Sequence, residues 1–486
     1  MSHQKKTSRR TFLKQCAALN TLGYSSIYSA IGGLGLTSQM AKAQTSRPSQ
    51  YRAIVCVYLT GGNDLNMLIP TDEDNYNLYS QLRGSFALDR SNNPSGNRDV
   101  FLPISSGSGG SQRNFGLHPA CGINTNNAGS GGFKDLYDDG NLAFIANTGS
   151  LLEPTTANQF RSESVNLPPS IGNHLIQKDF VRAGSFVNGS YNTGWAGRIA
   201  DLFQIQQGGT PLNMTLLGDN IWQRGEASST YSMSGASVRQ PVGYRATGST
   251  AAESLRRSVL DDVNNLSRDD SNLFIREYAR IAEQSFNLSD ALRDGAQDQA
   301  IQLNTVFPST VLGSQMRSVA QLINARNGLD MDQQIFYLDS GGWDMHQGLL
   351  ANHASNLEEL SAAMAAFYAA TVEMGLENQV LTFTNSDFGR TLQPNNNGSD
   401  HGWGGTQVVM GGRVNGGQVY GEFPMFEEGD GNGQFRDFRT IMVPSIATDQ
   451  VSSTIAKWFG DFSDSTLNEI FPNVGSFNSI DLGFIS

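Results

Sequence analysis

The chain has 486 residues, enough for one large domain or two to three small ones, and a core of that size is stable without disulfide bonds. Hydrophobic residues make up 38% and charged residues 16%, so Gly, Ser, Asn, Gln and Thr carry most of the polarity, which is typical of a loop-rich folded protein and not of a disordered one. A formal charge of −12 argues against a nucleic-acid partner, because phosphate binding depends on Lys and Arg.

The first 43 residues differ in charge from the rest. They hold six of the 33 basic residues and no acid, which leaves 27 basic residues against 45 acids, a charge of −18. A pair of arginines at 9–10 precedes a weakly apolar stretch over 16–36, and an Ala-Lys-Ala triplet follows at 41–43. This order predicts a twin-arginine signal over 1–43, export of the folded chain by the twin-arginine machinery, and a periplasmic or secreted location. No apolar stretch reaches the ~20 residues of a membrane span, so no transmembrane segment is expected in 44–486.

Runs typical of buried strands alternate with helical patterns along the rest of the chain. The strand-like runs lie at 51–59, 142–147, 334–339, 379–384 and 406–410. Helices are expected over 133–139, 268–293, 309–326, 352–376 and 450–459. The segments 71–117 and 221–265 have low apolar content and are expected to be loop or cap insertions. The alternation predicts one α/β domain over 44–486, with a mostly parallel central sheet flanked by helices.

Polar motifs directly follow four of these strands, at the edge where open α/β sheets bind ligands. The carboxylates and imidazoles in or near these motifs are Asp64, Asp344, His346, Asp387, Asp400 and His401. Such residues, without Cys, are ligands for Zn²⁺, Mn²⁺ or Mg²⁺, and two ions together would hold the attacking and leaving oxygens of a phosphoryl or sulfuryl ester. One or two divalent ions are therefore expected. A lone Asp after a strand is also a common turn or helix cap, and that role is favoured for Asp64 or Asp387 taken alone.

The positions of the cysteines favour free thiols over a disulfide bond. Cys16 falls within the predicted signal, Cys56 within a predicted buried strand, and Cys121 near a helix start. A disulfide between the last two is compatible with the periplasm, but a buried inert thiol is favoured for Cys56. The chain has no Cys-x-x-Cys motif, so a zinc ribbon is not expected.

The motifs follow one another in a specific order behind the predicted signal. They are Gly61-Gly62-Asn63-Asp64-x-Asn66, Gly342-Trp343-Asp344-x-His346, Ser386-Asp387-Phe388-Gly389-Arg390-Thr391 and Asp400-His401-Gly402. Together they resemble the DUF1501 family, which is assigned to the alkaline phosphatase and sulfatase superfamily, and the likeness covers nearly the whole chain. The resemblance implies an alkaline phosphatase-like fold and an exported metal-dependent hydrolase of a small-molecule or polymer phosphate or sulfate ester.

The superfamily pattern implies two metal sites. The resemblance assigns the first to Asp344, His346 and His401, and it makes Asp64 part of the second. Asp400 would either compensate as a ligand or orient His401 from behind.

Two positions depart from the family pattern. Phe388 follows Asp387 where the superfamily has an imidazole, so the second site is expected to be weak, mononuclear or absent. Asn173-His174 stands where similar sequences have Ser-His, and an amide cannot form a covalent phosphoryl intermediate. Either a metal-bound hydroxide replaces the nucleophile, or catalysis is lost and the chain is an envelope binding or assembly protein. Arg390 is expected either to pair with a phosphate or sulfate group or to form a structural ion pair.

Overall fold

The fold is described from a computed structural model of the chain. The residues that the structure describes are 48, 50–90, 99–106, 114–122, 131–184, 192–204, 212–216, 218–228, 230–232, 250–276, 278–280, 282–283, 286, 303–329, 331–423 and 441–486. The predicted signal over 1–43, with Cys16, lies outside them. Within these ranges, no helix combines the length and the apolar character that crossing a membrane requires.

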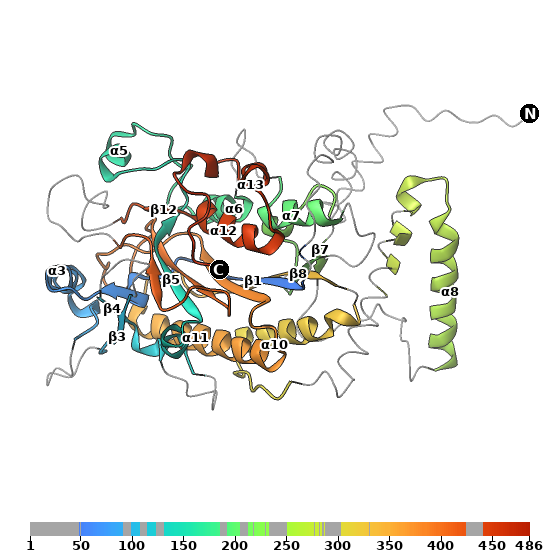
Figure 1. The fold of residues 1–486 in the computed structure, drawn as a ribbon, viewed down its shortest axis with the longest axis horizontal. Coiled ribbons are helices and arrows are strands. Elements are labelled where there is room, and N and C mark those ends of the chain that lie inside the picture. The colour runs from blue at the N-terminus through green and yellow to red at the C-terminus, as the bar shows by residue number, and fades with distance from the viewer. Residues whose placement is uncertain are drawn as a thin grey trace, which may run out of the picture.

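The core is a nine-stranded, mostly parallel sheet (Figure 1). Its order is β11-β5-β10-β9-β1-β8-β6-β7, with β12 paired to β5. The strands are β1 (Arg52–Leu59), β5 (Leu142–Gly149), β6 (Asn213–Thr215), β7 (Thr230–Ser232), β8 (Gln333–Ser340), β9 (Val380–Ser386), β10 (Gly405–Met410), β11 (Gln418–Tyr420) and β12 (Ile446–Ala447). Only β10 runs antiparallel to its neighbours in this sheet. The predicted α/β class is therefore confirmed, and the five apolar runs are β1, β5, β8, β9 and β10.

Strand β1 shows why an unbroken apolar run becomes a central strand. Its side chains alternate between two cores, with Val55 and Val57 on one face and Ile54 and Cys56 on the other. A strand that is covered on both faces has no solvent side, so it shows no polar alternation. It pairs in parallel with β8 on one side and β9 on the other, which brings the carboxyl ends of all three to one edge.

Helices cover both faces of this sheet (Figure 1). One core is closed by α10 (Val311–Asn324) and α11 (Leu349–Glu373), and the other by α6 (His174–Ala183), α7 (Trp195–Gln204), α12 (Thr448–Gly460) and α13 (Asp464–Ile470). The other α-helices with described bounds are α3 (Glu73–Arg83), α4 (Phe133–Asp138), α5 (Ala157–Ser162) and α8 (Ala251–Arg268). The helices expected over 133–139, 309–326, 352–376 and 450–459 are confirmed as α4, α10, α11 and α12.

The segment 71–117 is more ordered than its composition predicted. It contains α3 and two strands, β3 (Leu102–Ser105) and β4 (Asn114–Leu117), which form a small antiparallel sheet with β2 (Leu68–Pro70). The expectation of a plain loop was wrong here because the buried face of α3 is built from Asn, Tyr and Arg. Such a face carries no aliphatic period to mark the helix in the sequence.

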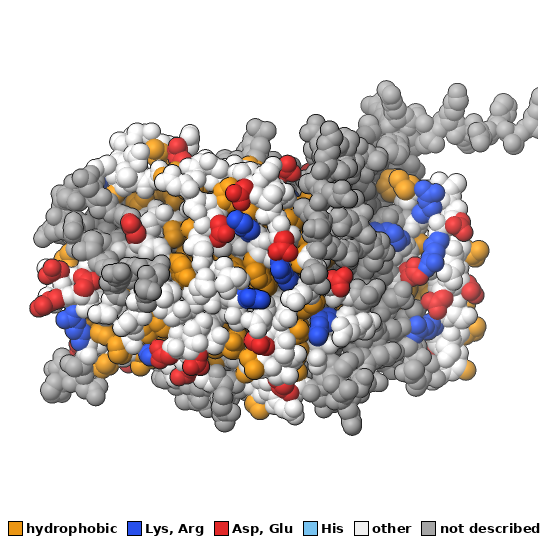
Figure 2. Space-filling model, in the orientation of Figure 1, with side chains coloured by type: hydrophobic (Ala, Val, Ile, Leu, Met, Phe, Trp, Pro, Cys, Tyr) orange, Lys and Arg blue, Asp and Glu red, His pale blue; other side chains and the backbone are white. Residues whose placement is uncertain are grey.

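Helix α8 begins within the segment 221–265, where a loop or cap insertion was expected. The Thr250 side chain caps the helix by accepting from the backbone N–H of Glu253. The Glu253 carboxylate in turn accepts from the backbone N–H of Thr250. The helix buries none of its residues, and Figure 2 shows acidic, basic and hydrophobic side chains side by side along it. In the sequence, only the Thr250-x-x-Glu253 capping pattern indicates where this helix begins. The helix expected over 268–293 begins where α8 ends and lies in a segment that is described only in part.

Cys56 and Cys121 are both free and buried. The alternative of a disulfide between them was therefore wrong, and the inert thiol favoured for Cys56 is confirmed. Burial raises the pKa of both thiols well above the ordinary value, which keeps them protonated and unreactive.

Candidate metal centre

The loops after β1 and β8 meet at the carboxyl edge of the sheet. Gly61 follows β1 with φ near +123°, and a Cβ atom there would lie 2.2 Å from the backbone nitrogen of Asp344. Only glycine tolerates both this backbone conformation and this approach. The contact positions Asp344 over the end of the sheet.

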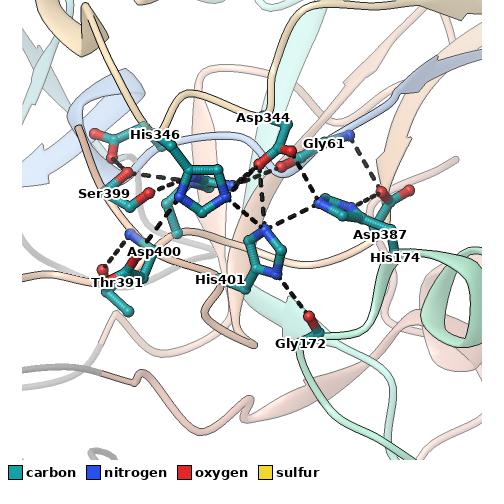
Figure 3. A network of polar contacts seen from close by, with 12 residues as sticks. Gly61, Gly172, His174, Asp344, His346, Asp387, Thr391, Ser399, Asp400 and His401 are labelled. Atoms are coloured by element: carbon teal, nitrogen blue, oxygen red, sulfur yellow. Dashed lines mark hydrogen bonds and ion pairs between the residues drawn. The ribbon is translucent and has the colours of Figure 1, made fainter. Parts of the chain in front are cut away.

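Four side chains converge beside this contact (Figure 3). His401 lies in the middle, with its Nε2 3.0 Å from Nε2 of His174 and 2.9 Å from Nε2 of His346. Asp344 closes the group: its Oδ1 is 3.2 Å from Nε2 of His401 and 3.1 Å from Nε2 of His346. Its Oδ2 is 3.3 Å from Nε2 of His174. His174, Asp344 and His401 offer ligand atoms that all lie within 4.8 Å of one another, and His346 approaches from the opposite side to His174.

The opposite ring nitrogens determine where the protons are. Nδ1 of His401 lies 2.7 Å from the carbonyl oxygen of Gly172, and Nδ1 of His174 lies 2.7 Å from the carboxylate of Asp387. Both partners are acceptors, so each Nδ1 carries the hydrogen and each Nε2 of a neutral ring holds a lone pair. Burial lowers the pKa of His401, even though the bond to the Gly172 carbonyl acts to raise it, so the ring is neutral at pH 7.

When both rings are neutral, two lone pairs and a carboxylate face one another at about 3 Å, and a cation between them removes their repulsion. Ligands at the usual Zn–N distance around a tetrahedral ion are about 3.3 Å apart. The shortest separations among His174, Asp344 and His401 are 3.0 to 3.3 Å, with Oδ1 of Asp344 facing His401 and Oδ2 facing His174. The donor set of two imidazoles and one carboxylate therefore fits one divalent ion.

Arg390 holds Asp344 in place. Its Nη1 lies 2.7 Å from Oδ1 of Asp344 and 3.1 Å from the carbonyl oxygen of Gly61, and its Nη2 donates to the carbonyl of Ser399. Burial acts to raise the pKa of Asp344, but the hydrogen bond and charge of Arg390 and the nearby imidazoles outweigh it and lower the pKa. The Arg390 side chain is fully buried, so it forms the structural ion pair and does not face a substrate.

The amino-acid sequence matches the family described as "Protein of unknown function (DUF1501)" over residues 51–457. The chain belongs to the DUF1501 family. No curated protein gives a significant match.

Solved structures with similarity to this DUF1501 chain include a sulfatase, a protein in complex with an oligosaccharide, and an alkaline phosphatase. The PsFucS1 sulfatase from Pseudoalteromonas sp. is 10% identical, with a TM-score of 0.30 over 91% of this chain and 73% of that one. Ps i-CgsB in complex with k-i-k-neocarrahexaose is 9% identical, with a TM-score of 0.34 over 88% and 77%. A mutant of alkaline phosphatase PafA is 8% identical, with a TM-score of 0.25 over 71% and 64%.

Asp387 lies behind the group rather than in it. Its Oδ2 accepts from Nδ1 of His174 and, at 3.2 Å, from the backbone N–H of Gly61, while its Oδ1 accepts from the Tyr58 hydroxyl at 2.6 Å. These bonds engage both oxygens with protein donors. Asp387 therefore orients His174, which is the usual task of a carboxylate behind a metal-binding imidazole.

Asp64 is likewise engaged elsewhere. Its Oδ1 lies 2.6 Å from Nη2 of Arg83, and the two side chains are 1% and 0% exposed. The carboxylate also caps the turn at Asn66. Burial acts to raise the pKa of Asp64, but Arg83 and these hydrogen bonds outweigh it and lower the pKa. The structure thus does not bring Asp64 to the group formed by His174, Asp344 and His401, and the described residues contain no second such group.

The two departures from the family pattern have structural roles. The Asn173 side chain caps α6 by accepting from the backbone N–H of Ile176, so it does not point into the group. The ring of Phe388 packs against His174 and His401, at 4.7 and 4.9 Å between centroids. An apolar ring where an imidazole was expected therefore supports two other imidazoles.

Asp400 faces the ring of His346 from behind, with its Oδ1 3.5 Å from Nδ1. Its carboxylate is 57% exposed and faces His346, whereas one of the two expected roles was to orient His401. The sequence had placed His174 in a nucleophile loop, and its position at the start of α6 is what turns it toward Asp344 and His401. The sequence did not identify Tyr58 as a site residue, because a tyrosine inside an apolar strand does not indicate which side chain its hydroxyl contacts.

Proposed function

We propose that the chain is an exported, metal-dependent hydrolase of phosphate or sulfate esters. The observation that carries the proposal is the convergence of Nε2 of His174, Nε2 of His401 and the Asp344 carboxylate, with both rings held in the tautomer that presents a lone pair. A divalent ion bound there lowers the pKa of a coordinated water toward ~7 and stabilises negative charge on an ester oxygen.

The accessibility of the group supports a reactive centre over a structural one. The side chains of His174 and His401 are 29% and 27% exposed, and that of Asp344 is 44% exposed. Three protein ligands with access to solvent are typical of catalytic zinc, whereas structural zinc is usually enclosed by four. His346, 46% exposed, stands at the rim, where it is placed to bind or to exchange a proton with an incoming ester.

The second candidate is a binding or assembly protein that retains the fold without turnover. It is favoured by Asn173, which is used as a helix cap, and by Phe388, which fills the place of an expected ligand. Both candidates predict a bound ion at His174, Asp344 and His401, so metal content tests the site and ester turnover separates the two functions.

The first experiment measures metal in protein purified from its native compartment by elemental analysis. We expect about one Zn or Mn per chain in the wild type, and a loss of most of it in a His174→Ala plus His401→Ala variant. An Asp138→Asn variant on α4 is a control, because it removes a carboxylate paired with Lys134 outside the group. Equal metal content in the wild type and the double variant would refute the site.

The second experiment assays aryl phosphate and aryl sulfate esters with the metal-loaded protein. We expect Asp344→Asn to remove the activity. Metal-loaded protein without turnover of either ester class would favour the binding or assembly role instead.

Export is tested separately from chemistry. We propose that the arginine pair Arg9-Arg10 directs the folded chain through the twin-arginine machinery. Replacing both with Lys keeps the charge, and we expect the chain then to remain in the cytoplasmic fraction. Undiminished export of this variant would overturn the proposal.

A further inference from the structure

Helix α6 carries two cations on the same face as His174. Lys178 and Arg182 follow His174 at intervals of four residues, so all three lie in one row along the helix. Four residues correspond to about 6 Å along a helix axis. The row therefore leads from the candidate metal centre to positive charge one turn away.

The two cations share one carboxylate. Nζ of Lys178 lies 3.9 Å and Nη2 of Arg182 lies 3.5 Å from Oδ2 of Asp339, at the end of β8. Among the residues that the structure describes, no other carboxylate pairs with either cation. Asp339 also accepts from the Thr60 hydroxyl at 2.8 Å. The cluster thus keeps one positive charge in excess, in a chain whose net charge is negative.

The two cations differ in how tightly they are held. The Arg182 guanidinium is buried, stacks on the rings of Tyr58 and Tyr337, and has an Nε that lacks a hydrogen-bond partner. The Lys178 side chain is a quarter exposed, and its ammonium group donates to the Thr60 hydroxyl at 3.4 Å. Arg182 therefore pairs with Asp339 from a buried position. Lys178, which also lies 5.6 Å from the centre of the Tyr58 ring, is partly exposed, so its ammonium group can contact an anion that arrives from solvent.

The loop that follows β8 leaves space for an anion. Gly341, directly after β8, is exposed, and a Cβ atom there would have no heavy atom within 4 Å. The space borders Asp339 and the loop that carries Asp344. Because Lys178 lies one turn along α6 from His174, an anionic group bound at Lys178 would lie beside the candidate metal centre.

We propose that Lys178 binds a second anionic group of the substrate, so that the protein selects esters that carry another carboxylate, sulfate or phosphate about one helical turn from the ester. The inference rests on the proposed function, because it takes the metal centre as the position of the ester itself. Lys178 is a specificity determinant and takes no part in breaking the ester bond.

The test measures equilibrium binding of two stable ester mimics to the metal-loaded protein by calorimetry. The probes are phenylphosphonate and 4-carboxyphenylphosphonate, which differ only in the second anion. We expect the carboxylated probe to bind about tenfold more tightly, the gain typical of a hydrogen bond to a charged group. In Lys178→Gln this preference should disappear, while the affinity for phenylphosphonate stays the same. The control Lys134→Gln removes a lysine on α4 whose side chain is equally exposed, at 25%, and which pairs with Asp138 instead, so it should leave the preference intact.

The outcomes separate this inference from the function on which it rests. Equal affinity for the two probes in the wild type, or an unchanged preference in Lys178→Gln, would overturn the role of Lys178 and leave the metal centre standing. Failure of both probes to bind metal-loaded protein, together with no ester turnover, would overturn both proposals. If phenyl and 4-carboxyphenyl phosphate are turned over, we expect Lys178→Gln to raise KM for the carboxylated ester alone and to leave kcat unchanged.

Discussion

The buried pair of Arg83 and Asp64 offers the sharpest test of how this site is built. Arg83 donates to Asp64 at 2.6 Å and to the backbone carbonyls of Thr391 and Leu392 at 3.2 and 2.9 Å. Neither side chain of the pair is more than 1% exposed. An Arg83→Met substitution keeps much of the volume but leaves a buried carboxylate without its counter-charge.

The expected loss follows from this burial. Removing one partner of a buried ion pair costs about 3–5 kcal/mol, because the remaining charge is neither solvated nor paired. An added Asp64→Asn substitution removes that charge, so the double variant should recover part of the loss. Without Arg83, burial raises the pKa of the stranded Asp64 carboxyl above the ordinary value of about 3.9, so the loss in Arg83→Met should shrink as the pH falls toward 3.9 and protonation neutralises this group.

Urea unfolding at pH 7 measures the free energies, and Arg224→Met is the matched control. Arg224 pairs with Asp219 at 2.8 Å, but the two side chains are 37% and 53% exposed. Such pairs contribute about 0–1 kcal/mol. Similar losses in the two arginine variants would refute the reasoning. The metal content of Asp64→Asn is a second readout: we expect it to match the wild type, and loss of metal would return Asp64 to the list of ligands.

Two further predictions concern the site and its surroundings. Asp387→Asn should weaken metal binding about 10- to 100-fold, measured by competition with a chelator, because it disturbs the bond that orients His174; an unchanged affinity would contradict the positioning role. Burial lowers the pKa of His353 to about 3, so the unfolded chain takes up this proton first, and the wild type should lose stability as the pH falls from about 6.5 toward 4. His353→Gln should make the free energy of unfolding less pH-dependent in that window, and parallel curves for the two proteins would rule out this contribution.

The central sheet was predictable from the sequence because its strands are buried on both faces. Strand β1 is an unbroken apolar run after Arg52, and its neighbours β8 and β9 contain shorter runs of apolar residues; such runs indicate burial on both faces. Helix α8 was missed because it buries nothing, and α3 was missed because its buried face is polar. In both helices only the capping residues marked the start, at Thr250 and Asp72.

The roles of the site residues depended on tertiary structure. By itself, the sequence predicted that Asp344, Asp387 and His401 belong to loops at the sheet edge, since an apolar run followed by a polar, glycine-containing motif is a local property of the chain. It could not determine which carboxylate faces an ion and which faces a protein donor. Asp387 is engaged by Tyr58, and Asp64 by Arg83, whereas His174 reaches Asp344 across 170 residues of sequence. Metal ligation depends on ångström distances and on the hydrogen-bond partner of each ring nitrogen, and only the packed chain defines these.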